Sequence, residues 1–340
     1  MEPRNGTSSG SVTPLLPDEA QFYINIWLVI VARTSLAAFG VASNMVNLTV
    51  FLRLGLKERV NLTLFCLSVC DAATCLCTAV VAANYVLVFR NFREGIDPST
   101  LVLFFSWFRC LFADVATSLT VFISIERCFC ITSPFVFNAK FSVTKTRTAL
   151  VLIILFIVIN YIPLYGSFKL EQTIDISSNT TITTFAVTEF YLKITMYNDY
   201  VLGIFLAIIC LIAVFVCAVL MQIGLRKSSE FRNNAVNDFK ISASEVSGKS
   251  RKNGYSRQDR KIVRMVLTLA CLYMTTALPQ IAISLAKVMF PELYSSALIN
   301  IYYTVMGVGH IFLIANGSLT IFIYYAYNSS YRGVFKNKFF

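Results

Sequence analysis

Residues 200–225 read YVLGIFLAIICLIAVFVCAVLMQIGL, and no Asp, Glu, Lys or Arg interrupts them. About 20 consecutive apolar residues are needed to cross the hydrocarbon core of a bilayer as an α-helix. A backbone in lipid must satisfy its own hydrogen bonds, and the strands of a membrane β-barrel would be shorter, with alternating polarity. The stretch therefore predicts a transmembrane helix.

The rest of the chain has the same character. Of its 340 residues 56% are hydrophobic and 14% are charged, whereas an ordinary soluble domain carries about 25% charged residues. The net charge of +11 is spread between apolar segments, so we expect no nucleic-acid partner. The predicted fold is an all-α membrane protein, a seven-transmembrane helix bundle. Its predicted spans are 23–52, 61–89, 99–131, 146–167, 198–225, 261–288 and 297–326.

The distribution of positive charge predicts the orientation of this helix bundle. If the C-terminus is cytoplasmic, that side holds 21 of the 29 lysines and arginines, and positive charge favours the inside. We therefore expect an extracellular N-terminal segment (1–22), a third cytoplasmic loop (226–260) and a multi-pass protein of the plasma membrane. Residues 1–20 lack the apolar core of a signal peptide, so the first span is expected to direct insertion. Residues 327–340 place aromatic side chains at i, i+4 and i+8, which predicts a cytoplasmic amphipathic helix on membrane lipid.

The cysteines, histidine and sequons add a few expectations. All ten cysteines lie in or beside the spans, so we expect core residues and no disulfide. A single histidine and the lack of a Cys-x-x-Cys pair argue against a metal site, and no cofactor is expected. Asn5 and Asn179 open N-glycosylation sequons on the predicted outside.

Polar residues inside the spans are costly in lipid and are therefore candidates for function. Span one contains Asn44 and Asn47, span two contains Asp71, and span six contains Pro279. Span three ends in Glu126-Arg127-Cys128, and Pro134-Phe135 follows. Span seven reads Asn316-Gly-Ser-Leu-Thr-Ile-Phe-Ile-Tyr324.

In order along seven spans, these residues resemble the marker positions of rhodopsin-like (class A) G-protein-coupled receptors. Glu126-Arg127-Cys128 is similar to the Asp-Arg-Tyr motif of that family, and Tyr324 matches the tyrosine of its Asn-Pro-x-x-Tyr motif. The resemblance extends from about residue 25 to residue 335. The other matching positions are Asn44, Asp71, Pro134-Phe135, Pro279 and Tyr331-Arg332.

The chain also departs from that family. Val102 stands where the usual outer cysteine would be, and Thr276-Ala-Leu-Pro279 replaces Cys-Trp-x-Pro. The tryptophan of span four and the proline of span five are missing. This pattern is similar to divergent invertebrate chemosensory receptors of the molluscan type, and peptide receptors of the FMRFamide-like kind are the alternative.

The resemblance implies roles at the cytoplasmic end and in the middle of the bundle. Glu126 and Arg127 would form an ion pair that opens on activation, with Phe135, Pro279 and Tyr324 contributing to coupling. Asn44, Asp71 and Asn316 would form a polar cluster that holds a sodium ion in the family. Since Ala116, Gly317 and Thr320 replace ion ligands here, a protonated structural Asp71 is the alternative.

A ligand site is predicted at the other end of span three. Arg109 lies 18 residues before Arg127, which is about five helical turns, so both arginines share one face about 27 Å apart. By resemblance, His310 and Gln280 match other pocket positions, and Arg33 adds a second cation. Guanidinium groups prefer carboxylates and phosphates, so we expect an anionic small molecule or a peptide with a free C-terminus. The alternative is that Arg109 reaches the headgroups or pairs with Glu189 or Asp199.

Two classes of function remain open. The first is a receptor that binds an extracellular ligand and activates a heterotrimeric G protein. The second is a transporter or channel, which would normally show internal repeats or paired intramembrane charges. An enzyme is not expected, because the chain shows no nucleophile–histidine–acid set and no phosphate-binding loop.

Overall fold

The computed structural model describes residues 14–90, 95–133, 142–175, 180–241, 257–295 and 297–339. Three predicted functional residues, Asn5, Phe135 and Asn179, lie outside these ranges.

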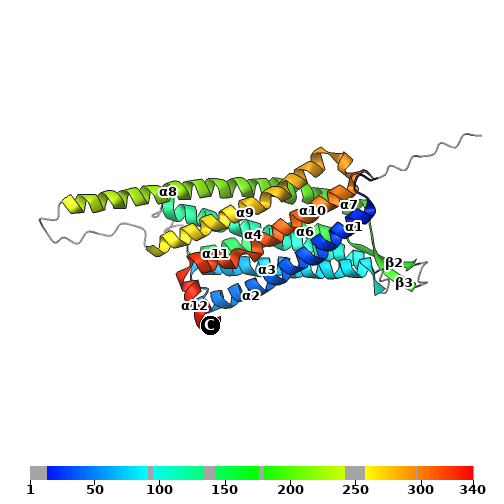
Figure 1. Ribbon diagram of the computed structural model, residues 1–340, viewed down its shortest axis with the longest axis horizontal. Helices are drawn as coiled ribbons and strands as arrows, with labels where there is room; N and C mark the ends of the chain where they lie inside the picture. Colours follow the sequence, from blue (N-terminus) through cyan, green and yellow to red (C-terminus); the bar gives the residue numbers. More distant parts are fainter. Residues whose placement is uncertain are drawn as a thin grey trace, which may run out of the picture.

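Within the described residues, seven helices are long and apolar enough to cross a membrane, and they run side by side along the long axis (Figure 1). The first span consists of α1 (Asp18–Asn25), the π-helix η1 (Ile26–Arg33) and α2 (Thr34–Leu54). The next three are α3 (Arg59–Phe89), α4 (Pro98–Thr132) and α6 (Val143–Gly166). The fifth consists of α7 (Glu189–Asn198), the π-helix η2 (Asp199–Leu206) and α8 (Ala207–Ile241). The last two are α9 (Arg257–Met289), then the short η3 (Pro291–Tyr294), and α10 (Ile299–Ser318) with α11 (Thr320–Tyr327). The chain ends in α12 (Ser329–Phe339).

The seven-helix prediction is confirmed, but some boundaries were wrong. The fifth span begins at Glu189 instead of 198, because charged residues there extend the helix beyond the apolar run. Thr188 caps it by accepting a bond from the Tyr191 N–H, and Lys193 pairs with Glu189 one turn away at 2.6 Å. The predicted loop 226–260 is partly helical, since α8 continues to Ile241 and α9 begins at Arg257. The helix α1 begins at Asp18, so the last residues of the predicted N-terminal segment 1–22 are helical.

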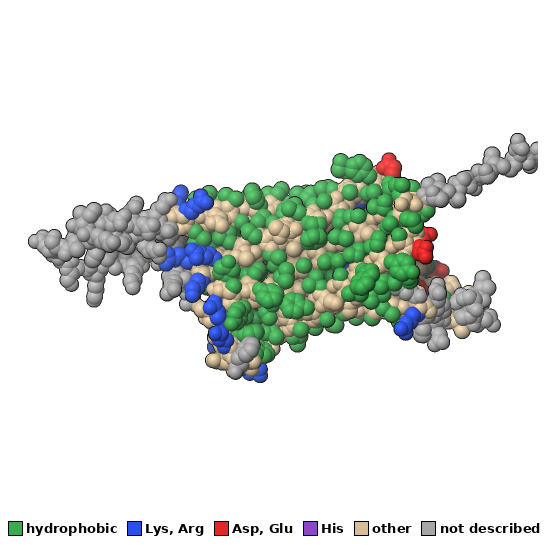
Figure 2. Space-filling model, viewed as in Figure 1, with side chains coloured by type: hydrophobic (Ala, Val, Ile, Leu, Met, Phe, Trp, Pro, Cys, Tyr) green, Lys and Arg blue, Asp and Glu red, His purple; other side chains and the backbone are tan. Residues whose placement is uncertain are grey.

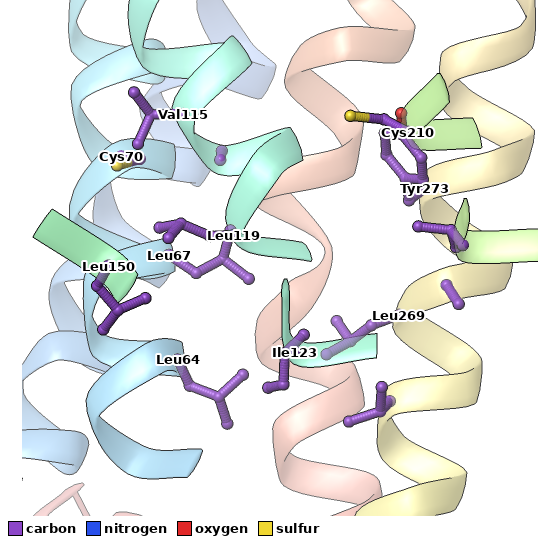
Figure 3. Packing of buried hydrophobic residues seen from close by; sticks show 14 of the residues in the cluster. Leu64, Leu67, Cys70, Val115, Leu119, Ile123, Leu150, Cys210, Leu269 and Tyr273 are labelled. Carbon is purple, nitrogen blue, oxygen red and sulfur yellow. The ribbon is translucent and has the colours of Figure 1, made fainter. Parts of the chain in front are cut away.

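The core and the lipid-facing surface follow the apolar pattern. Leu64 and Leu67 of α3 are buried against Leu119 and Ile123 of α4, and Leu269 of α9 packs from the other side (Figure 3). The outward sides of the helices are also apolar, so the flank of the molecule is covered with hydrophobic side chains (Figure 2). Such a surface is stable in lipid and not in water.

Charge separates the two ends of the bundle. Lysines and arginines gather at the end that carries α12, whereas acidic side chains are visible at the opposite end (Figure 2). This arrangement matches the predicted orientation with the α12 end in the cytoplasm. Below, the α12 end is called the inner end and the opposite end the outer end.

A small sheet at the outer end was missed by the all-α prediction. The strands β2 (Lys169–Asp175) and β3 (Thr180–Ala186) form an antiparallel hairpin in which Gln172 lies opposite Thr183. The short β1 (Gly95–Ile96) pairs in parallel with β3, which gives the order β1-β3-β2. A criterion based on long apolar runs cannot detect short strands rich in threonine and isoleucine, although these β-branched residues favour strands.

The β2–β3 hairpin is attached to the helix bundle by non-covalent contacts. The Phe185 N–H donates to Thr100 Oγ1 of α4 at 3.0 Å. The Phe185 ring also lies 4.7 Å from the rings of both Phe168 and Tyr191, measured between centroids. All ten cysteines have free thiols.

We therefore expect the outer end to tolerate reductant. Dithiothreitol should leave the thermal denaturation midpoint of the purified protein unchanged. Phe185→Ala should destabilise it by about 1–3 kcal/mol, because two aromatic pairs and their apolar contacts are lost. Thermal denaturation with and without reductant tests both points, and a lower midpoint in reductant alone would contradict this account.

Candidate functional site

The outer half of the bundle encloses a cavity of about 730 Å³, which we call the outer cavity. The four residues predicted to bind the ligand all line it, and each comes from a different helical element. They are Arg33 of η1, Arg109 of α4, Gln280 of α9 and His310 of α10. Four chain segments that lie far apart in the sequence therefore converge on one space.

The two arginines in this cavity have unused hydrogen-bonding capacity. Arg109 is 3% exposed, and its Nη2 lies 3.0 Å from His310 Nε2. Among the described residues, Arg109 Nε and Nη1 and Arg33 Nε have no hydrogen-bond partner. A buried donor without an acceptor is costly, and a guanidinium is more costly than a neutral group. The cavity therefore presents donors that an anionic ligand would satisfy.

The alternative roles considered for Arg109 do not match the geometry. Glu189 pairs with Lys193, and Asp199 pairs with Lys287 of α9. Arg109 also contacts a residue on α10, so its side chain points into the bundle and not toward the headgroups.

Sequence reasoning missed the Asp199–Lys287 pair as part of this site. Asp199 begins η2 and Lys287 lies in the last turn of α9, so the ion pair joins the fifth and sixth spans at the outer end. Both residues line the outer cavity. Two charges at the ends of otherwise apolar spans were a signal that could have identified them.

A second, deeper cavity of about 160 Å³, the inner cavity, adjoins the first. Asp114 of α4 lines it and accepts a hydrogen bond from the Tyr161 hydroxyl of α6 at 2.7 Å. Sequence reasoning did not assign Asp114 to a site. An intramembrane carboxylate is itself a signal of function.

The three residues of the predicted polar cluster fall into two groups: Asn44 belongs to a hydrogen-bond network, and Asp71 and Asn316 line a small void. Asn44 donates to the Gly317 carbonyl at 3.2 Å and accepts from Asn47 Nδ2 at 3.1 Å. Asn47 in turn accepts from the Tyr331 hydroxyl at 2.6 Å, which ties α12 to α2. Tyr331, which belongs to the predicted amphipathic helix 327–340, is fully buried, because this bond and the Phe51 ring draw it into the bundle.

Asp71 and Asn316 line a small void of about 10 Å³ beside this network. That volume is close to the minimum for one water molecule. Gly317 makes the close approach of α10 possible, since a Cβ atom there would lie 2.8 Å from the Asp71 carboxyl carbon. The sodium-site role of Asn44, Asp71 and Asn316 stays a prediction.

At the inner end, Glu126 and Arg127 lie together. Arg127 Nη2 is 3.1 Å from Glu126 Oε1, and Arg59 Nε of α3 is 3.7 Å from the same oxygen. Glu126 is fully buried. Sequence reasoning missed Arg59, because its contact with Glu126 depends on how α3 packs against α4.

Two further residues predicted to act in coupling lie in the sixth and seventh spans. Pro279 is inside α9, where it leaves the Thr275 carbonyl without its helical N–H donor. Tyr324 of α11 is fully buried, with its ring 5.2 Å from that of Phe51. The structure thus places a missing backbone hydrogen bond in α9 and a buried, packed aromatic ring in α11.

Seven apolar helices around an outer cavity, with a buried arginine–glutamate pair at the other end, define a multi-pass membrane protein with a seven-helix bundle. The family model of the serpentine-type seven-transmembrane G-protein-coupled chemoreceptors, Srw, matches residues 31–340. The chain belongs to this family. Comparison with curated proteins gives no match. The family is generally non-enzymatic, and its members act in the plasma membrane with extracellular ligands and G proteins as partners.

Proposed function

We propose that this chemoreceptor binds a small carboxylate ligand in the outer cavity and activates a heterotrimeric G protein at the inner end. The observation that carries the proposal is the buried Arg109 beside His310, where two guanidinium nitrogens have no hydrogen-bond partner among the residues that the structure describes. Arg33 brings a second guanidinium to the same cavity. A carboxylate binds a guanidinium through two parallel hydrogen bonds, and these bonds are strong when water is excluded.

The dimensions of the cavity favour a small molecule. Pockets that enclose small organic ligands typically measure about 300–1,000 Å³, and the outer cavity lies within this range. A peptide would leave most of its length outside, so a receptor of the FMRFamide-like kind is the less favoured alternative.

The two ends would be coupled by a shift in population. A ligand that binds more tightly to an active arrangement of the helices stabilises that arrangement. Lys287, the partner of Asp199, and Pro279 both lie on α9, which therefore connects the outer cavity with the inner end. Movement of α9 about Pro279 would expose the inner surface and release Arg127 from Glu126.

The test is agonist-stimulated nucleotide exchange in membranes that contain the full chain and a G protein. A panel of small carboxylic acids is compared with the matched primary amides. We expect stimulation by acids and at least about tenfold weaker stimulation by their amides, since an amide cannot form the charged pair. Agonists that are all neutral or cationic would contradict the ligand class. Substrate flux without nucleotide exchange would indicate a transporter.

A further inference from the structure

The two cavities carry opposite charge. Among the described residues, the lining of the inner cavity contains two carboxylates, Asp114 and Asp199, and no lysine or arginine. The outer cavity contains Arg33, Arg109 and Lys287 together with Asp199. Because Asp199 and Lys287 neutralise each other, two guanidiniums remain in the outer cavity and one carboxylate remains in the inner cavity.

The cavities adjoin one another. Six residues line both of them: Trp107, Cys110, Asp199, Gln280, Ser284 and His310. His310, the partner of Arg109, is among these shared residues, so the cationic group lies at the boundary. One elongated molecule in contact with these shared walls would therefore extend from Arg109 into the inner cavity.

Within the described part of the chain, the carboxylate in the inner cavity has a neutral hydrogen-bond partner. Asp114 Oδ2 accepts from the Tyr161 hydroxyl at 2.7 Å, and Asp114 is half-buried on the wall of the cavity. A hydroxyl supplies one hydrogen bond and no positive charge. A carboxylate in a low-dielectric space is stabilised by a cation, and an ammonium group with three donors fits that requirement.

The two charged residues lie at different levels of α4 and on different sides of it. Asp114 follows Arg109 by five residues on α4, which places it about 7.5 Å further along the axis and about 140° around the helix. The side chains also diverge, because Arg109 contacts α10 and Asp114 contacts α6. An α-amino acid, whose charged groups are attached to one carbon, cannot span this separation.

We infer that the ligand is a zwitterion with separated charges, an ω-amino acid type of molecule. Its carboxylate binds Arg109 and Arg33, and its ammonium group binds Asp114 in the inner cavity. This inference rests on the proposed function, because it uses the same carboxylate site, and it adds a second, cationic requirement.

The experiment measures ligand-induced thermal stabilisation of the full chain in lipid nanodiscs. The probes are ε-aminocaproate, caproate and hexylamine, which share one chain length and differ only in their charged ends. We expect ε-aminocaproate to bind the wild type at least about tenfold more tightly than either single-charge probe, since it satisfies both sites. Two shorter homologues, δ-aminovalerate and γ-aminobutyrate, should bind progressively less well.

Two variants separate the two sites. Asp114→Asn keeps an acceptor for Tyr161 and removes the charge, so it should weaken ε-aminocaproate at least about tenfold and leave caproate unchanged. Arg109→Gln should weaken both probes. Tyr161→Phe is the control for a structural role, because it removes the hydrogen bond but leaves the carboxylate, and it should preserve the preference for ε-aminocaproate.

The outcomes distinguish the two proposals. If caproate binds through Arg109 but Asp114→Asn leaves the preference for ε-aminocaproate unchanged, or no such preference exists, the zwitterion inference is wrong and the carboxylate site stands. If Arg109→Gln changes nothing, the carboxylate site itself is wrong. The absence of stabilisation by every probe would overturn both.

Discussion

Arg127→Ala is expected to lose agonist-stimulated nucleotide exchange while ligand binding at the outer cavity is retained. The Arg127 guanidinium lies on the inner end of α4, 3.1 Å from Glu126, and would contact the G protein once that pair opens. Loss of a buried arginine at the centre of an interface costs about 2–4 kcal/mol, or roughly a 30- to 1,000-fold decrease in coupling.

The packing around Glu126 makes this variant informative. Glu126 is fully buried, and a buried carboxylate left without any cation would be an unpaired charge. Arg59 remains 3.7 Å from the same carboxylate oxygen in the Arg127→Ala variant, so we expect the bundle to fold. Binding of the acid probe and thermal denaturation check the fold, and nucleotide exchange reports coupling.

Glu126→Gln is the matched control for the Arg127 prediction. It removes the charge that holds Arg127 and keeps the shape of the side chain. We expect higher exchange without agonist, because the closed arrangement loses its ion pair. Wild-type exchange in Arg127→Ala, or unchanged basal exchange in Glu126→Gln, would show that the pair is structural only.

Arg109→Gln is expected to lower the potency of carboxylate agonists by about 10- to 100-fold. A hydrogen bond to a charged group is worth about 1.5–3 kcal/mol, and each 1.4 kcal/mol corresponds to a factor of ten. The replacement keeps donors near His310 but removes the fixed charge. Potency in the nucleotide-exchange assay is the measurement.

A parallel variant tests how the two guanidiniums share the ligand. Arg33 lines the same cavity from η1, without a bond to His310, so Arg33→Gln should cause a smaller loss than Arg109→Gln. The acid-to-amide potency ratio should approach one only when Arg109 is changed. Equal potency of wild type and Arg109→Gln toward acids would place the ligand elsewhere.

The sequence was sufficient for the seven helices, because a long apolar run is a property of each segment alone. It failed at the boundaries for the same reason. Glu189 and Lys193 lie in a part of the fifth helix that extends beyond the apolar run, and helix capping and a local charge pair, not hydropathy, determine where it starts. The strands β2 and β3 were not predicted, because each is stabilised by pairing with the other, and the apolar content of one segment does not reveal that pairing.

In the candidate site, too, features of a single helix could be predicted and contacts between helices could not. Arg109 could be placed on the inward face of α4, because its spacing from Arg127 is an arithmetic property of one helix. Its contact with His310, the pairing of Asp199 with Lys287 and the bond from Tyr161 to Asp114 each join two helices. Such contacts depend on how helices rotate and pack, and no single-helix pattern contains that information.

The aromatic attachment of the outer hairpin has a consequence for how this surface can change. A disulfide requires two cysteines at a specific separation, so one substitution removes the whole constraint. The contacts of Phe185 with Phe168, Tyr191 and Thr100 each contribute separately to the stability of the hairpin's attachment. Phe168→Ala or Tyr191→Ala would remove one aromatic contact of Phe185 and leave the other, and the backbone bond to Thr100 would remain even in Phe185→Ala. The sequence of β2 and β3 can therefore be varied in single steps, each passing through a folded protein, which makes the hairpin a suitable region for building receptor variants.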